Sequence, residues 1–163
     1  MANIIYAPEE YPLNHPCSVF LAGSIDMGKA FDWQQALCDS LNGYDIVLLN
    51  PRRKSWDASW EQSIDNPLFA EQVNWELDAL EHATCIVMHL ASGSKAPISL
   101  LELGLFANSQ KIIISCAPDF WRHGNVEIVC SRYNIPLYSS VSELERILKT
   151  RFEKQLQKTN PLS

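Results

Sequence analysis

One carboxylate, Glu102, stands in a largely apolar stretch, residues 99–104, that follows Pro97. Proline suits the first turn of a helix, so the spacing predicts that Glu102 lies near the positive end of a helix, which favours the ionised carboxylate. In a pocket, such a carboxylate can attack the anomeric carbon of a ribosyl group and form a covalent glycosyl-enzyme intermediate. The same spacing, Ser99-x-x-Glu102, also fits a capping box, in which the glutamate only ties down the helix start. The spacing alone favours the capping role.

Two further carboxylates, Glu76 and Asp78, lie in a segment with helical periodicity, residues 72–80. Residues two positions apart on a helix point about 200° away from each other. We therefore expect only one of the two carboxylates to face a given ligand.

A glycine-containing loop, residues 23–29, supplies small residues and backbone amides. Gly23 and Ser24, with Asp26 beside them, would let a sugar or a phosphate approach the backbone closely. A plain turn after a buried strand explains the same residues equally well. The segment is not a P-loop, because Ala30 stands where a serine or threonine would follow the lysine.

A long connection, residues 50–66, carries two tryptophans and three cations. Connections of this length in a compact domain are usually lids or binding loops. Trp56 and Trp60 could stack on a base, while Arg52 and Arg53 could hold a carboxylate, a phosphate or a neighbouring subunit. The two tryptophans could equally form a small core private to the loop.

The elements that must position these groups follow a regular alternation. Continuous apolar runs at residues 18–22, 45–49, 85–90 and 111–116 predict strands covered on both faces, and a weaker run at 135–138 contains a proline that favours an edge. Helical periodicity occurs at about residues 28–42, 68–82, 98–109, 124–133 and 142–157. We therefore predict an α/β fold, a single doubly wound domain with a five-stranded parallel sheet and helices on both faces. Its ligand crevice would lie beyond the carboxyl ends of the strands, where the loops described above meet.

The domain boundaries follow from proline content and polarity. Residues 1–16 contain three prolines and are expected to form an irregular arm, residues 17–157 the folded domain, and residues 158–163 a frayed polar tail. Ser142 and Glu145 fit a capping box, which predicts that the last helix starts near residue 142.

Composition narrows the class of partner. The 163 residues carry a net charge of −6, so there is no surplus of cations to hold a nucleic-acid polymer, although a single nucleotide needs only a few donors.

The sequence shows neither a basic leader with an apolar run nor a membrane-length apolar window, and we expect a cytoplasmic protein. Five cysteines without a C-x-x-C pair are expected to be reduced core thiols. His82 and His89 lack metal-ligand spacing, so no metal site is predicted.

Four motifs in order, at residues 20–25, 50–53, 72–76 and 99–104, make the chain resemble the nucleoside 2-deoxyribosyltransferase-like family over about residues 18–130. They read Phe-Leu-Ala-Gly-Ser-Ile, Asn-Pro-Arg-Arg, Gln-x-x-Trp-Glu and Ser-Leu-Leu-Glu-Leu-Gly. The resemblance implies a flavodoxin-like sheet and an enzyme that cleaves the N-glycosidic bond of a nucleoside, or a related small N-glycoside, or transfers its (deoxy)ribosyl group.

The resemblance also implies roles for particular residues. Glu102 would be the nucleophile, and Glu76 would position the base or assist its protonation. Asn125 would reach the sugar or the nucleophile from a neighbouring subunit, so a homodimer or higher homo-oligomer with a shared active site is implied. The remaining substrate contacts are assigned to Gly23, Ser24, Asp26, Asp78 and Ser99. No metal or organic cofactor is required.

Departures from the family pattern leave two alternatives open. Thr84, Glu76 and Ala96 stand where aspartates are usual, and the tyrosine expected on the first strand is missing, with Phe20 nearby. These changes support a non-catalytic nucleotide-binding or sensing module on the same fold. The loop at Gly23 also resembles that of nucleoside 5′-monophosphate N-glycosidases, but Asp26 replaces their cation, so Lys29 or the Arg52–Arg53 pair would have to bind the phosphate.

Overall fold

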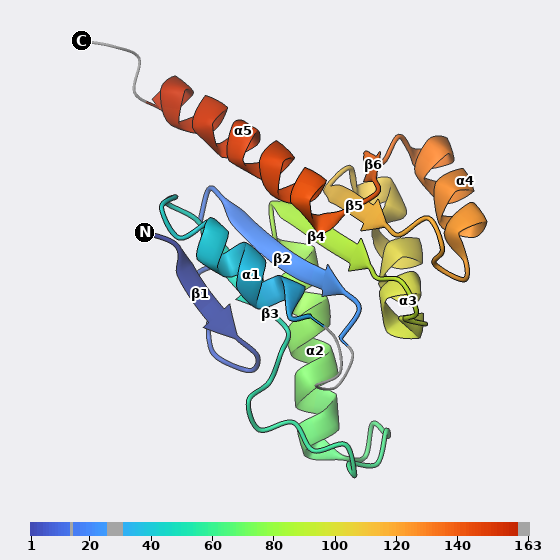
Figure 1. Ribbon diagram of the computed structural model, residues 1–163. Helices are drawn as coiled ribbons and strands as arrows, with labels where there is room; N and C mark the ends of the chain where they lie inside the picture. The colour runs from blue at the N-terminus through green and yellow to red at the C-terminus, as the bar shows by residue number, and fades with distance from the viewer. Residues whose placement is uncertain (14, 26–30, 160–163) are drawn as a thin grey trace.

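The structure is a computed structural model that describes residues 1–13, 15–25 and 31–159, with side chains described as far as residue 154. Within these residues the strands are β1 (Asn3–Tyr6), β2 (Ser18–Gly23), β3 (Val47–Asn50), β4 (Cys85–Leu90), β5 (Ile112–Cys116) and β6 (Leu137–Tyr138). They form one parallel sheet in the order β1-β3-β2-β4-β5-β6 (Figure 1). The strand order reverses at β2, and this is where a ligand crevice is expected in an open parallel sheet.

Helices cover both faces of the sheet, which confirms the doubly wound α/β prediction. They are α1 (Trp33–Ser40), α2 (Pro67–His82), α3 (Pro97–Phe106), α4 (His123–Tyr133) and α5 (Val141–Thr159), with a 3-10 turn, η1 (Ala107–Ser109), continuing α3. One apolar core joins α1 and α5 to the sheet through residues such as Leu37 and Leu144. The other core joins α2, α3 and α4 to the opposite face through residues such as Leu80, Leu103 and Val126.

The sheet has a sixth strand where the sequence predicts an irregular arm. Strand β1 pairs in parallel with β3, from Asn3 opposite Val47 to Tyr6 opposite Asn50. The prolines of the arm begin only at Pro8, so residues 3–6 keep the backbone donors that a strand needs. Without β1, the remaining five strands have the flavodoxin-like order 2-1-3-4-5.

Two helix starts differ from the prediction. Helix α1 begins at Trp33, with Asp32 accepting a hydrogen bond from the Gln35 amide at 3.0 Å. Helix α5 begins at Val141, and its cap uses Ser140, whose hydroxyl accepts from the Glu143 amide at 3.3 Å. Glu143 in turn accepts from the Ser139 amide at 2.8 Å. The capping pair therefore lies two residues before the predicted Ser142–Glu145 pair, because Ser140 and Ser142 are each followed three residues later by a glutamate.

The remaining sequence expectations concern the membrane and the thiols. No helix in the described part of the chain is long and apolar enough to cross a bilayer. Four of the cysteines, Cys38, Cys85, Cys116 and Cys130, are buried free thiols.

Gly23, at the end of β2, lets the two central strands approach closely. Its φ of +133° is in a region that side chains rarely adopt, and a Cβ there would overlap the backbone carbonyl of His89 on β4. The next amide, that of Ser24, donates to the same His89 carbonyl at 2.8 Å, and the Ser24 hydroxyl accepts from the Ala91 amide at 3.1 Å. The loops that leave β2 and β4 are thereby held side by side.

Replacing Gly23 by alanine should lower the free energy of unfolding by at least about 2 kcal/mol, because the methyl group meets backbone that has little room to move. Urea unfolding of Gly23→Ala against the unmodified protein measures the loss. In Gly124→Ala the new Cβ enters open space on α4, so stability should stay level or rise by up to about 1 kcal/mol. Equal stabilities for the two variants would contradict this account of Gly23.

Candidate active site

A cavity of about 500 Å³ lies at the carboxyl ends of the central strands. It is lined from four parts of the chain: the end of β2, the long loop before α2, one face of α2, and the first turns of α3. Most lining side chains are apolar, among them Phe20, Phe69, Val73 and Leu101. Among the described residues, the carboxylates that line it are Glu76 and Glu102. The cavity is of the size and character of small-molecule sites.

Glu102 does not cap the start of helix α3. Helix α3 begins at Pro97, its N-cap is Ala96, and no side chain bonds to its first amides. Ser99 and Glu102 therefore lie inside the helix, and the capping box that the spacing favours does not form. Glu102 is 8% exposed and lines the cavity.

Burial, and to a smaller extent the nearby Glu76 carboxylate, together raise the pKa of Glu102 to about 8. This differs from the expectation that the helix end favours the ionised form. The effect of the helix dipole is confined to the first turn, whereas Glu102 is the sixth residue of α3. Removal from water is the larger influence, so Glu102 is mainly protonated at neutral pH.

Glu76 reaches the same cavity from α2 and is held by Gln72, one turn earlier on that helix. The Gln72 side-chain amide donates to Glu76 Oε1 at 2.7 Å and to the Pro51 carbonyl oxygen at 2.8 Å. Burial raises the pKa of Glu76, and the hydrogen bond from Gln72 opposes this rise. Two carboxyl groups in one poorly solvated cavity titrate as a pair rather than independently.

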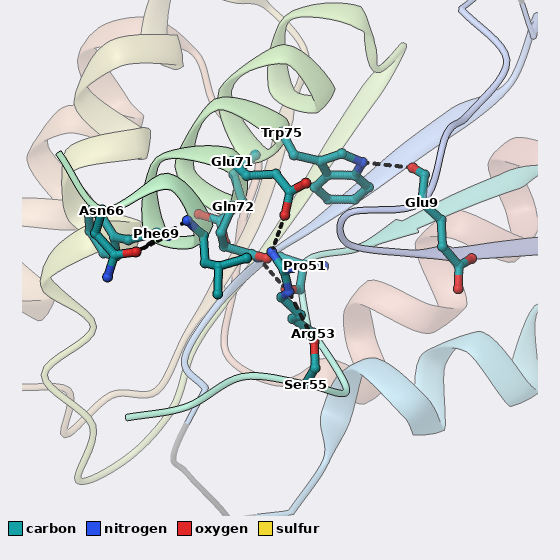
Figure 2. Close-up of polar contacts among 11 residues, drawn as sticks. Glu9, Pro51, Arg53, Ser55, Asn66, Phe69, Glu71, Gln72 and Trp75 are labelled. Atoms are coloured by element: carbon teal, nitrogen blue, oxygen red, sulfur yellow. Dashed lines mark hydrogen bonds and ion pairs between the residues drawn. The ribbon is translucent and has the colours of Figure 1, made fainter. Parts of the chain in front are cut away.

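The long loop is bound to α2 by the contacts in Figure 2. Arg53 forms an ion pair with Glu71 on α2, 2.7 Å between Nη1 and Oε2, and donates to Ser55 at 3.2 Å. The Trp56 and Trp60 rings meet edge to face, 5.1 Å between centroids. Trp56 also lines the cavity, so the loop has both its own aromatic contact and a wall of the site.

Both arginines of the loop are engaged with carboxylates. Arg52 contacts Asp32 at 3.2 Å and donates to Gln34 at 3.1 Å, and Arg53 contacts Glu71. An anion entering the cavity would have to compete with these partners.

The other predicted site residues are placed as follows. Gly23 and Ser99 line the cavity, whereas Ser24 is buried and bonds to the Ala91 amide. Asp78 is exposed and lies outside the cavity lining, as the spacing argument for Glu76 and Asp78 requires. Asn125 is exposed on α4 and also outside the lining formed by a single chain. Asp26 and Lys29 lie outside the described residues.

Sequence reasoning assigned no role to Gln72, although it is 3% exposed and lines the cavity. Its signal in the sequence is the spacing of four from Glu76, which places both side chains on one helix face.

In the described residues, no group of three or more His, Cys, Asp or Glu side chains is placed to hold a metal ion.

Comparison with known proteins gives a family and a fold. The model of the family described as nucleoside 2-deoxyribosyltransferase like matches residues 16–120. Among solved structures, the chain is similar to a conserved protein from Enterococcus faecalis V583, with a TM-score of 0.59 and 12% identity over 83% of this chain and 98% of that one. At this identity the likeness concerns the fold alone. No curated protein matches.

The raised pKa of Glu102 should make stability fall as pH rises. Between about pH 5 and 8 the folded protein keeps a proton on Glu102 that the unfolded chain has lost, so stability is lost until the folded pKa is passed. Glu102→Gln removes this effect, and its stability relative to the unmodified protein should increase from pH 5 to pH 8 by at least about 1 kcal/mol. Urea unfolding at both pH values measures the difference.

Carboxyl NMR gives the matching control. Glu76→Gln should lower the pKa of Glu102, because it removes the neighbouring charge. A pH-independent stability difference for Glu102→Gln would show that Glu102 is ionised throughout this range.

Proposed function

Because the chain belongs to the nucleoside 2-deoxyribosyltransferase-like family, we propose that it cleaves the N-glycosidic bond of a nucleoside, or transfers the (deoxy)ribosyl group, through a covalent glycosyl–Glu102 intermediate. The supporting observation is that Glu102 and Glu76 come from different helices and share one apolar cavity in which their charges interact. A nucleophile and a proton donor are the two groups that this reaction needs.

The reactive state is one in which the pair carries a single proton. Burial favours the proton on Glu102, and the hydrogen bond from the Gln72 amide favours Glu76 as the carboxylate. Chemistry requires the opposite arrangement, with Glu102 ionised and Glu76 protonated. Moving one proton between the two groups creates it without changing the net charge of the cavity.

The bonds then change in two steps. A Glu102 oxygen forms a bond to the anomeric carbon while the bond from that carbon to the base nitrogen breaks, and its electron pair leaves with the base. Glu76 gives its proton to the departing base. Water or a second base next bonds to the same carbon and gives a proton to the Glu76 carboxylate, while the bond to Glu102 breaks with its electron pair on the carboxylate oxygen. The sugar therefore keeps its configuration, and Glu76 is protonated again.

The other residues are assigned to substrate contacts. Ser99, one turn before Glu102, and Gly23 lie on the cavity wall, where we place the sugar. Ser24 supports this wall, and Asp26 is proposed to contact the sugar or the base. Asp78 is retained only as an outer contact, since its side chain is exposed.

A second copy of the chain is proposed to cover the open side of the site. Ile98, Leu101 and Leu105 form an apolar stripe on α3, each 59% exposed, and all three line the cavity. An exposed apolar helix face is unusual on a monomer and suits a self-complementary interface. Helix α4, with Asn125 exposed on it, packs against the 3-10 turn that continues α3. A partner bound there would bring its Asn125 towards the cavity.

The monophosphate N-glycosidase alternative has less support, because Arg52 and Arg53 are both paired with carboxylates. A sensing module would need neither the shared proton nor a nucleophile, and the first experiment below distinguishes it.

Glu102→Gln should lower the rates of base release and base exchange by at least about 1,000-fold. These rates are measured by incubating the protein with a panel of nucleosides and free bases and following the reaction by chromatography. Glu76→Gln should reduce the rate by about 100-fold or more. Glu81→Gln, at an exposed position near the end of α2, is the matched control and should keep full activity. Mass spectrometry of quenched reactions should find a pentosyl adduct on the Glu102 peptide. Nucleoside binding without turnover would instead establish the sensing module.

The apolar stripe should hold an oligomer together. Sedimentation of the unmodified protein should give a dimer or larger assembly, and Leu101→Glu should weaken it by at least about tenfold in dissociation constant, because a charge would be buried without a partner. Leu13→Glu, at a position 58% exposed on the N-terminal segment, should leave the assembly unchanged. A monomeric unmodified protein would overturn this part of the proposal.

A further inference from the structure

The orientation of the Gln72 amide is fixed by its neighbours. Its nitrogen donates to Pro51 O at 2.8 Å and to Glu76 Oε1 at 2.7 Å. A backbone carbonyl only accepts hydrogen bonds, so turning the amide over would set two oxygens against each other. Gln72 Oε1 therefore points away from Pro51 O and Glu76 Oε1.

This amide oxygen lacks a donor. Gln72 Oε1 is buried and has no hydrogen-bond partner among the described residues, although the side chain lines the cavity. Leaving a buried acceptor unpaired costs free energy, and native proteins seldom tolerate it without a purpose. Because the Gln72 side chain lines the cavity, a donor carried by a ligand that packs against this wall is the natural partner.

Glu76 supplies the complementary group beside it. Because Glu76 Oε1 accepts from Gln72, a proton on this carboxyl group must reside on Oε2. The wall of the cavity then presents one donor, the Glu76 hydroxyl, and one acceptor, Gln72 Oε1. Such a pair matches a ligand edge with a ring nitrogen next to an amino group.

We propose, building on the function proposed above, that Gln72 and Glu76 select nucleosides whose base carries an amino group beside the protonated ring nitrogen. A 6-aminopurine offers N7 as acceptor and its amino group as donor, whereas a 6-oxopurine offers two acceptors on the same edge. The oxo group would face Gln72 Oε1 and leave it unpaired. The same reasoning favours 4-aminopyrimidines over 4-oxopyrimidines.

Two matched substrate pairs test the proposal. The value of kcat/KM for 2′-deoxyadenosine should exceed that for 2′-deoxyinosine by at least about tenfold, the effect of one unpaired buried acceptor. The pair 2′-deoxycytidine and 2′-deoxyuridine should show the same preference. These measurements use the unmodified protein and do not depend on the folding of a variant.

Gln72→Met then assigns the preference to this side chain. The variant keeps the length of the side chain but removes its acceptor, so the amino-to-oxo ratio should fall to within about threefold of unity. Asn74→Met removes an exposed amide from the same helix and should keep the ratio of the unmodified protein.

The outcomes separate this inference from the function on which it rests. Turnover of both members of each pair at equal rates, or faster turnover of the oxo compounds, would overturn the amino preference and leave the glycosidic reaction intact. If no nucleoside is cleaved, the proposed function fails, and calorimetry with free adenine and hypoxanthine decides the inference. Tighter binding of adenine, lost in Gln72→Met, supports it. Equal binding, or binding of neither base, refutes it.

Discussion

The close approach of β2 and β4 at Gly23 is the constraint on which the site depends. The hydrogen bonds from the Ser24 amide to His89 and from the Ala91 amide to Ser24 hold two loops together at the reversal of strand order. One loop borders the cavity directly, and the other leads into α3, which carries Glu102. A larger residue at Gly23 would force these loops apart and move the helix away from the cavity. The position of the carboxylate is thus set by backbone packing in the sheet.

The second organising feature is the cost of burying two carboxyl groups in one apolar cavity. Burial and mutual repulsion keep a proton on the pair at neutral pH, as the raised pKa of Glu102 shows. Hydrogen bonds from one side, through Gln72, make the two groups unequal. Burying this pair lowers the stability of the fold, and destabilising arrangements of this kind are common where groups are positioned for chemistry.

Much of the fold follows from the sequence because its strands are continuous apolar runs and its helices are periodic. The four strong runs and the weaker one are all strands, and the five periodic segments are all helices. The first strand escapes prediction because four residues beside several prolines carry little pattern. The predicted cap of the last helix is two residues late, because Ser140 and Ser142 are each followed three residues later by a glutamate. The site itself was harder to predict. That Glu102 faces a cavity and caps nothing depends on where α3 begins, and the isolated oxygen of Gln72 depends on contact with Pro51, which is distant in sequence.

The first strand has a consequence for how the protein is made. Residues 3–6 are synthesised before their partners in β3, residues 47–50, which are made more than forty residues later. The edge position of β1 means that the other strands can assemble without it. During synthesis residues 3–6 therefore stay unpaired until β3 has been made. The hydrogen bond from Trp75 Nε1 to the Glu9 carbonyl, 2.8 Å long, can form only after α2 has been made. Docking of residues 3–6 therefore has to follow the synthesis of β3, and the Glu9 contact has to follow that of α2, so this edge of the sheet is completed by long-range contacts only.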